Sequence, residues 1–147
     1  MRPLIRHGPI LLAEDDPDDR LLLEHAFRVS GNTLPLVFVE DGEELVEYLC
    51  RRGRFVGAPR PDLVVLDLNM PRKDGREALA AIKGDPDLRC IPIVVLTTSN
   101  MPEDVANAYA LGANSFVSKP VTFEGLVAVV RALHAWWFGI VTLPDGR

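Results

Sequence analysis

The stretch Asp62-Leu-Val-Val-Leu66, followed directly by Asp67, decides how this chain folds. Four consecutive apolar residues that end at a charged residue are typical of a strand buried on both faces, as in a parallel sheet. Comparable apolar runs predict strands at residues 10–13, 35–39, 91–96 and 115–117. Segments with helical spacing separate them, at residues 21–29, 43–52, 76–83, 102–111 and 123–138. Strands that alternate with helices predict a doubly wound α/β fold, a five-stranded parallel sheet with helices on both faces.

Two of these helices carry specific expectations about the side chains that face the core. In the first helix, one stripe consists of Leu22, Ala26 and Val29. In the last helix, the stripe that should pack on the sheet consists of Leu126, Val129, Val130, Leu133 and Trp137. Gly139 is expected to end that helix.

Composition indicates one globular domain. The chain has 147 residues, and we expect a domain core over about residues 9–133 with a helix extension and tail over 134–147. Lys and Arg total 16 against 21 Asp and Glu, a net charge of −5, which argues against a nucleic-acid partner. Residues 126–143 contain Arg131, so we expect no membrane span. Cys50 and Cys90 are expected to be buried thiols of a cytoplasmic protein.

Polar residues stand where four of the predicted strands end. Glu14 and Asp15 follow the first strand, Asp67 the third, Thr97 ends the fourth, and Lys119 follows the fifth. In the strand order 2-1-3-4-5 these ends meet at one edge of the sheet, where open α/β sheets bind ligands. Clustered carboxylates repel one another unless a cation is present, and all-oxygen ligands suit Mg²⁺. A cation, an amine and a hydroxyl can hold a phosphoryl group, and a carboxylate can accept it as an aspartyl phosphate.

Each of these residues also has a purely structural interpretation. Asp15 or Asp16 can cap the following helix, and Asp67 can be a turn residue. Lys119 can be a solvated surface charge, and Thr97 an ordinary strand residue. The joint occurrence at the ends of four strands favours a functional site over these separate explanations.

The set resembles the receiver domain of two-component response regulators over about residues 10–133. The matching motifs are Glu14-Asp15, Asp67 within Val-Val-Leu-Asp-Leu-Asn-Met-Pro-Arg-Lys-Asp-Gly, Thr97, and Lys119-Pro120. The resemblance implies a flavodoxin-like receiver fold with Asp67 as the phosphoacceptor and Thr97 and Lys119 on the phosphoryl oxygens. It implies a Mg²⁺ site made of Glu14, Asp15, Asp67 and the backbone carbonyl of Asn69. It also implies a switch formed by Thr97 and Phe116, and a cis peptide bond before Pro120.

The sequence departs from the usual family pattern at one site residue, and other segments resemble a narrower group within the family. Glu14 stands where the family more often has Asp, so we expect it to act on the metal through water. Asn69 and Ser99 occupy the positions that shape hydrolysis in the family, which leaves the phosphate lifetime open. The loop at residues 58–62, the phrase at residues 68–77 and the tail at residues 140–144 resemble single-domain regulators of phytochrome-type histidine kinases. A bacteriophytochrome-like sensor kinase is therefore the expected phosphodonor.

Three other functions compete with a phosphoaccepting regulator that signals through protein contacts. A phosphatase with Asp67 as nucleophile would want a second acid two residues on, where this chain has Asn69. A phosphorylation-silent pseudo-receiver would not need the complete acidic, Thr and Lys set. A flavodoxin-like FMN protein would not place Glu14-Asp15-Asp16 against a phosphate. We therefore expect no conventional enzyme, although the chain would catalyse its own phosphorylation and dephosphorylation.

The carboxyl end carries more apolar side chains than one small domain needs. Trp136 and Phe138 lie off the core-facing stripe, and Ile140 and Val141 follow the expected helix end. Left exposed together, they would form a large apolar patch. They predict a homodimer through the last helix and the tail, and the alternative is a tail that folds back over its own domain.

Overall fold

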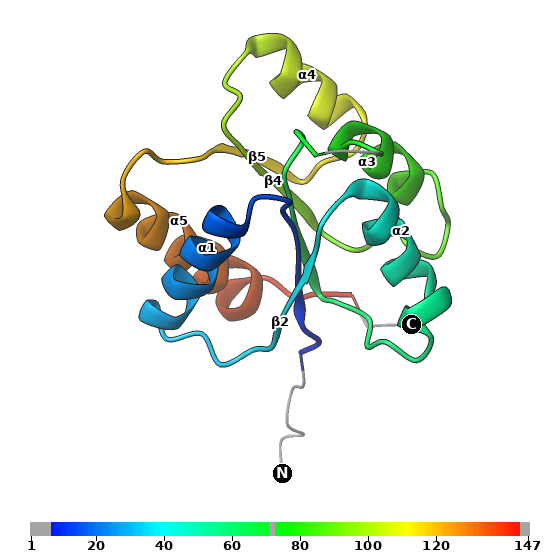
Figure 1. Cartoon of the computed structure of the whole chain (residues 1–147), viewed down its shortest axis with the longest axis horizontal. Helices are drawn as coiled ribbons and strands as arrows, with labels where there is room; N and C mark the ends of the chain where they lie inside the picture. Colours follow the sequence, from blue (N-terminus) through cyan, green and yellow to red (C-terminus); the bar gives the residue numbers. More distant parts are fainter. Residues whose placement is uncertain (1–6, 71–72, 145–147) are drawn as a thin grey trace.

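Five parallel strands form a single sheet in the order β2-β1-β3-β4-β5, which confirms the predicted fold class. The computed structural model describes residues 7–70 and 73–144 (Figure 1). The strands are β1 (Ile10–Ala13), β2 (Leu36–Val39), β3 (Leu63–Leu66), β4 (Ile93–Thr97) and β5 (Ser115–Ser118). The helices are α1 (Pro17–Val29), α2 (Gly42–Cys50), α3 (Gly75–Lys83), α4 (Pro102–Ala110) and α5 (Phe123–Ala135). A 3₁₀ turn, η1 (Gly53–Phe55), follows α2, and a π-helical turn, η2 (Trp136–Ile140), continues α5.

The helices cover both faces of the sheet. Helices α1 and α5 pack on one face, and α2, α3 and α4 pack on the other (Figure 1). Every residue of β1, β3 and β4 is buried, because successive side chains of a central strand enter the two cores in turn. This confirms the expectation that the strand after Asp62 is buried on both faces.

Helix starts are fixed by short polar residues near the functional end of the sheet. The Asp16 carboxylate accepts the N–H groups of Asp18 and Asp19, at 2.8 and 3.3 Å, and so caps α1. The Asp74 carboxylate caps α3 in the same way. Only glycine fits at Gly75, because an added Cβ would lie 2.4 Å from the carbonyl oxygen of Asp67. This close approach lets α3 begin directly against the end of β3.

Two expectations about side-chain burial were wrong. Helix α1 buries Leu23, Ala26 and Phe27, whereas Leu22 and Val29 are exposed. The buried residues of α1 pack in one core cluster with Val127, Val130 and Leu133 of α5. Cys50 is half-buried and Cys90 is exposed; both thiols are free.

Helix α5 faces the core largely as predicted. Val127, Val130 and Leu133 are buried, and Leu126, Val129 and Trp137 pack partly buried against the same core. The run 123–140 has the length and apolar composition of a membrane span. Its inner side chains pack with α1 and the sheet in one core cluster, so it is a helix of this domain.

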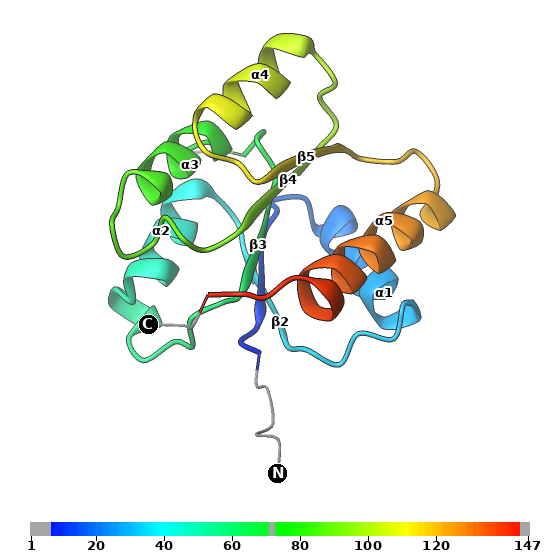
Figure 2. The ribbon, with the colours of Figure 1, turned by 180° about the vertical axis from the view of Figure 1, so that it is seen from behind.

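The end of α5 and the tail differ from the prediction. Gly139 does not end the helix, because a π turn carries it on to Ile140 and the N–H of Val141 bonds to the carbonyl of Trp136 at 3.0 Å. The tail then crosses the end of the sheet where the strands begin, and Pro144 lies with Pro61 and Pro92 (Figure 2). The tail therefore folds back over its own domain, the alternative that we had set against dimerisation.

One edge of the sheet is formed by β5. The backbone N–H of Phe116 donates a hydrogen bond of 3.1 Å to the hydroxyl of Tyr109, which comes from α4. The Tyr109 side chain thus accepts a backbone N–H that would otherwise be free to pair with another strand at this edge.

Candidate functional site

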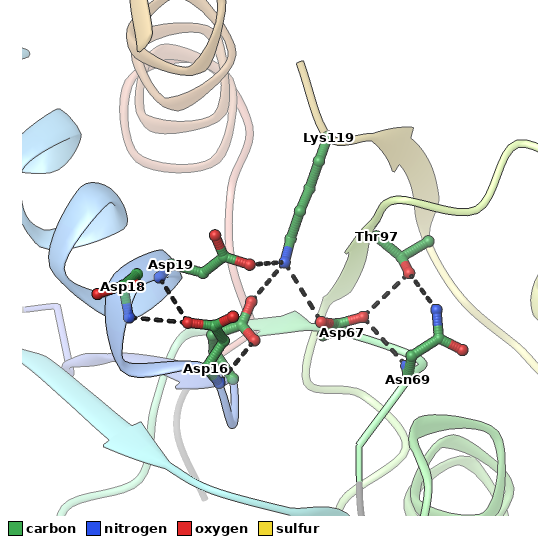
Figure 3. Close-up of polar contacts among 8 residues, drawn as sticks. Asp16, Asp18, Asp19, Asp67, Asn69, Thr97 and Lys119 are labelled. Carbon is green, nitrogen blue, oxygen red and sulfur yellow. Dashed lines mark hydrogen bonds and ion pairs between the residues drawn. The ribbon is translucent and has the colours of Figure 1, made fainter. Parts of the chain in front are cut away.

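The carboxyl ends of β1, β3, β4 and β5 bring the predicted polar residues together (Figure 3). Asp67 lies at the centre. Its Oδ1 accepts hydrogen bonds from the Thr97 hydroxyl and from the Asn69 backbone N–H, each at 3.0 Å. Its Oδ2 lies 3.3 Å from the Nζ atom of Lys119. Both oxygens of this nearly buried carboxylate are therefore oriented by neighbouring groups.

Lys119 is shared by three carboxylates. Its Nζ lies 2.5 Å from Glu14 Oε1, 3.2 Å from Asp19 Oδ2 and 3.3 Å from Asp67 Oδ2. An ammonium has three N–H donors, so these partners use all of them. The side chain of Lys119 reaches from the end of β5 into the middle of the acidic group (Figure 3).

Burial and charge act in opposite directions on these groups. Burial raises the pKa of Glu14, and the hydrogen bond from Lys119 only partly offsets this effect. For Lys119, burial lowers the pKa, but the hydrogen bond to Glu14 and the charge of Asp67 outweigh it. The net result is a pKa of Lys119 above its usual range, which favours the ammonium form.

Glu14, Asp15 and Asp67 can hold a cation. One oxygen atom of each lies within 4.8 Å of the others, with Asp15 exposed and the other two buried. Three hard oxygen ligands fit a divalent cation. Asp16 has a different role, because it caps α1. The Asn69 side chain donates to the Thr97 hydroxyl at 3.4 Å, and its carbonyl as a metal ligand stays a prediction.

The two residues that we predict to form a switch lie on neighbouring strands, Thr97 on β4 and Phe116 on β5. The Thr97 hydroxyl points to Asp67, and Phe116 is half-buried against the core beneath α2, α3 and α4.

The peptide bond before Pro120 is not cis, as no cis bond occurs in residues 7–70 and 73–144. That expectation was wrong. Trans is the lower-energy form of an X–Pro bond, and Lys119 reaches Asp67 with the bond in that form.

Sequence reasoning missed two groups of residues. Asp19 contacts Lys119, and the available signal was its place on the first turn of α1, one turn after Asp16. In the second group, Asp104 of α4 accepts a hydrogen bond from the Ser99 hydroxyl. Asp104 also forms an ion pair with Arg76 of α3, at 3.0 Å. The Ser118 hydroxyl bonds to the Ser99 carbonyl at 3.3 Å. These contacts link the loop after Thr97 to α3, α4 and β5.

An apolar hollow of about 220 Å³ lies beside Lys119. It is formed by α1, the loop after β5 and the start of α5. Its lining residues are Asp19, Leu22, Leu23, Lys119, Pro120, Val121, Thr122, Phe123 and Leu126. Leu22 and Val121 are exposed at its rim. A partner that enters this hollow would come within reach of the Lys119 site.

Comparisons with known proteins agree with this geometry. Residues 10–131 match the response regulator receiver domain family. The response regulator Rcp1 of Synechocystis is 41% identical over 135 residues, 92% of this chain and 92% of Rcp1. The crystal structure of the phosphorylated cyanobacterial phytochrome response regulator RcpA superposes with a TM-score of 0.90 at 41% identity, covering 95% of this chain and 100% of RcpA.

A Mn²⁺-bound structure of Rcp1 superposes with a TM-score of 0.87 at 40% identity, covering 94% of this chain and 99% of Rcp1. The match to the family spans most of the chain, and the strand order and the clustered side chains agree with it. The chain belongs to the response regulator receiver domain family, and it is similar to phytochrome response regulators.

Proposed function

We propose that this protein accepts a phosphoryl group on Asp67 from the phosphohistidine of a sensor histidine kinase and passes the signal on by protein contacts. The arrangement around Asp67 carries the proposal. One carboxylate oxygen is held by two hydrogen-bond donors and the other faces Lys119, at the edge of an acidic cluster. A carboxylate held in this way is oriented for attack on phosphorus.

The chain's own residues supply the chemistry of transfer. A carboxylate oxygen of Asp67 forms a bond to phosphorus while the bond from phosphorus to the donor imidazole breaks. Lys119 and Thr97 stabilise the charge on the phosphoryl oxygens, which is the main protein contribution in phosphoryl transfer. Asp15 and Asp67, with the carbonyl of Asn69 and with Glu14 through water, would hold Mg²⁺. The bound ion would neutralise charge between the carboxylates and the phosphoryl group.

The other candidate functions fit the site less well. A phosphatase of the two-acid kind lacks its second acid, because the side chain two residues after Asp67 is the Asn69 amide, which donates to Thr97. A pseudo-receiver would not need Thr97, Lys119 and the acidic cluster together. The complete set favours a phosphoacceptor.

The hollow beside Lys119 supports a docking surface for the kinase. It places exposed apolar side chains, Leu22 and Val121, next to the site that must meet the phosphohistidine. Similarity to RcpA supports a phytochrome-type kinase as the donor, and similarity to the bacteriophytochrome response regulator RtBRR supports a bacteriophytochrome-like one. We further propose a cytoplasmic location, with no nucleic-acid or membrane partner, in keeping with the net charge of −5.

The carboxyl end supports a smaller dimer surface than its composition predicts. Phe138 packs on its own domain, with ring centres 5.0 Å from His7 and 5.4 Å from His134. Val141 is half-buried. Trp136 and Ile140 remain 50% and 69% exposed. We propose that these two side chains form the centre of a homodimer contact at the end of α5.

Labelling with radioactive acetyl phosphate and Mg²⁺ tests the phosphoacceptor. The parent should take up label that hydroxylamine removes, and chelation of the metal should abolish it. Asp67→Asn should take up none, because it lacks the anionic nucleophile. Asp74→Asn is the matched control, since Asn caps a helix as well as Asp does. Uptake by Asp67→Asn at the parent's rate would overturn the assignment.

A further inference from the structure

The side chain of Asp19 is the most exposed of the three carboxylates that bind Lys119. Its exposed fraction is 38%, against 2% for Glu14 and 10% for Asp67. It approaches from α1, while Asp67 approaches from the end of β3 (Figure 3). Glu14 follows the end of β1. Glu14 also receives the backbone N–H of Asp16 at 3.2 Å. Glu14 is thus fixed in the site, and Asp19 lies at its rim.

Each N–H of the Lys119 ammonium already has a carboxylate. Phosphorylation of Asp67 frees only the N–H that faces Asp67. A second contact between Lys119 and the phosphoryl group therefore requires that Glu14 or Asp19 loses its own contact. Breaking the contact between Lys119 and Glu14 would leave a buried charge without its partner, which is strongly unfavourable. Breaking the contact between Lys119 and Asp19 costs little, because water can solvate a carboxylate at the rim of the site.

We infer that Asp19 is a positioning residue that holds Lys119 in the unphosphorylated state and releases it to the phosphoryl group. Asp19 competes with the phosphoryl oxygens for the same ammonium. The inference rests on the proposed function, because it requires that Asp67 is the acceptor. It adds a residue outside the cluster of Glu14, Asp15 and Asp67 to the phosphorylation site.

The competition has a defined consequence for binding of a phosphoryl analogue. Asp19→Asn removes the competing charge, so the Lys119 donor becomes available without a loss elsewhere. Beryllofluoride, which stands for the phosphoryl group on Asp67, should bind about two- to fivefold more tightly, the range of a partly exposed ion pair. The affinity for Mg²⁺ alone should change less than that for beryllofluoride, because Asp19 lies outside the acidic cluster.

Asp18 provides a matched control. It lies on the same turn of α1, and its carboxylate points away from Lys119 (Figure 3). Asp18→Asn removes the same charge at the same helix end, so it measures the general electrostatic effect on an anion. Asp19→Glu keeps the charge and can reach Lys119, so it should restore affinity toward the parent value.

The experiment is calorimetric titration of the full chain with beryllofluoride at saturating Mg²⁺, with Mg²⁺ titrated alone as the second readout. Tighter beryllofluoride binding by Asp19→Asn than by Asp18→Asn, reversed in Asp19→Glu, supports the inference. Equal effects of the two Asn variants, or an equal change in Mg²⁺ affinity, overturn it while the proposed function stands. A parent that binds no beryllofluoride, and takes up no phosphoryl group from acetyl phosphate, overturns the proposed function and this inference with it.

Discussion

The hydroxyl of Thr97, at the end of β4, donates a 3.0 Å hydrogen bond to Asp67 at the end of β3. The side chain already faces the acceptor, and Phe116 is half-buried against the core. We expect phosphorylation to tighten an arrangement that is largely formed, through added charge-assisted contacts.

Thr97→Val tests this coupling. Beryllofluoride should slow amide hydrogen exchange over residues 98–118 in the parent, and the variant should lose most of that effect. Its free energy of unfolding should also fall by about 1 kcal/mol, because a buried hydrogen bond is lost. Thr98→Val, at an exposed neighbouring position, is the control. Parent-like protection in Thr97→Val would contradict the role of Thr97 in the switch.

Leu22→Glu should impair phosphorylation by the kinase selectively. It places a charge at the rim of the hollow where we propose that the kinase docks. The rate of transfer from a phosphorylated kinase, divided by the rate from acetyl phosphate, should fall about tenfold, a typical loss for a central interface residue. Leu21 lies at the preceding position of α1, is exposed and does not line the hollow. Leu21→Glu should therefore leave the ratio near the parent value. An unchanged ratio in Leu22→Glu would place the kinase elsewhere.

The contacts of Asp104 predict a pH effect on stability. The hydrogen bond from Ser99, with the contacts from Arg76, holds the pKa of Asp104 below its ordinary value of 3.8. A depressed carboxyl pKa stabilises the folded state above the ordinary value and ceases to do so as pH falls through the folded-state value. Urea unfolding of the parent and Asp104→Asn should therefore differ more at pH 6 than at pH 3. Glu103→Gln on the same turn is the control, and a pH-independent difference would contradict the prediction.

Lys83, the last residue of α3, hydrogen-bonds to the loop that follows the helix and to the residue before β5. Its Nζ donates to the carbonyls of Arg89 and Ile91, each at 2.9 Å, and to the Asn114 side chain at 3.2 Å. Burial lowers its pKa. Lys83→Met keeps the aliphatic chain but leaves the carbonyls of Arg89 and Ile91 without this donor, whereas Asn114 keeps the backbone N–H of Ile93 at 2.8 Å. The free energy of unfolding should therefore fall by about 1 kcal/mol. Lys73→Met gives the same change in charge, and an equal loss of stability in both would exclude a specific role for Lys83.

Trp136→Glu should convert the proposed dimer to a monomer. Trp136 is half-exposed beside Ile140, and a charge there opposes burial of the contact. Light scattering at micromolar concentration should give about twice the chain mass for the parent and a lower mass for the variant. Phe138→Ala should instead lower thermal stability, because Phe138 packs on His7 and His134. A monomeric parent at high micromolar concentration would contradict the dimer.

The strands and the site-forming strand ends could be predicted because they depend on local pattern and on simple topology. Buried runs such as 63–66 identify strands, and parallel order brings Asp67 and Lys119 to one edge. The contact of Asp19 with Lys119 could not be predicted in this way, because it joins residues 100 positions apart through the reach of a long side chain. The burial of Leu23 in place of Leu22, and the path of the tail, depend on how whole elements pack.

The hydrogen bond from the Phe116 N–H to the Tyr109 hydroxyl has a consequence for assembly. An open strand edge invites indiscriminate growth of the sheet into aggregates. The Tyr109 hydroxyl removes one backbone donor of β5 from pairing with another strand. The contact thus makes this edge a poorer template for aggregation.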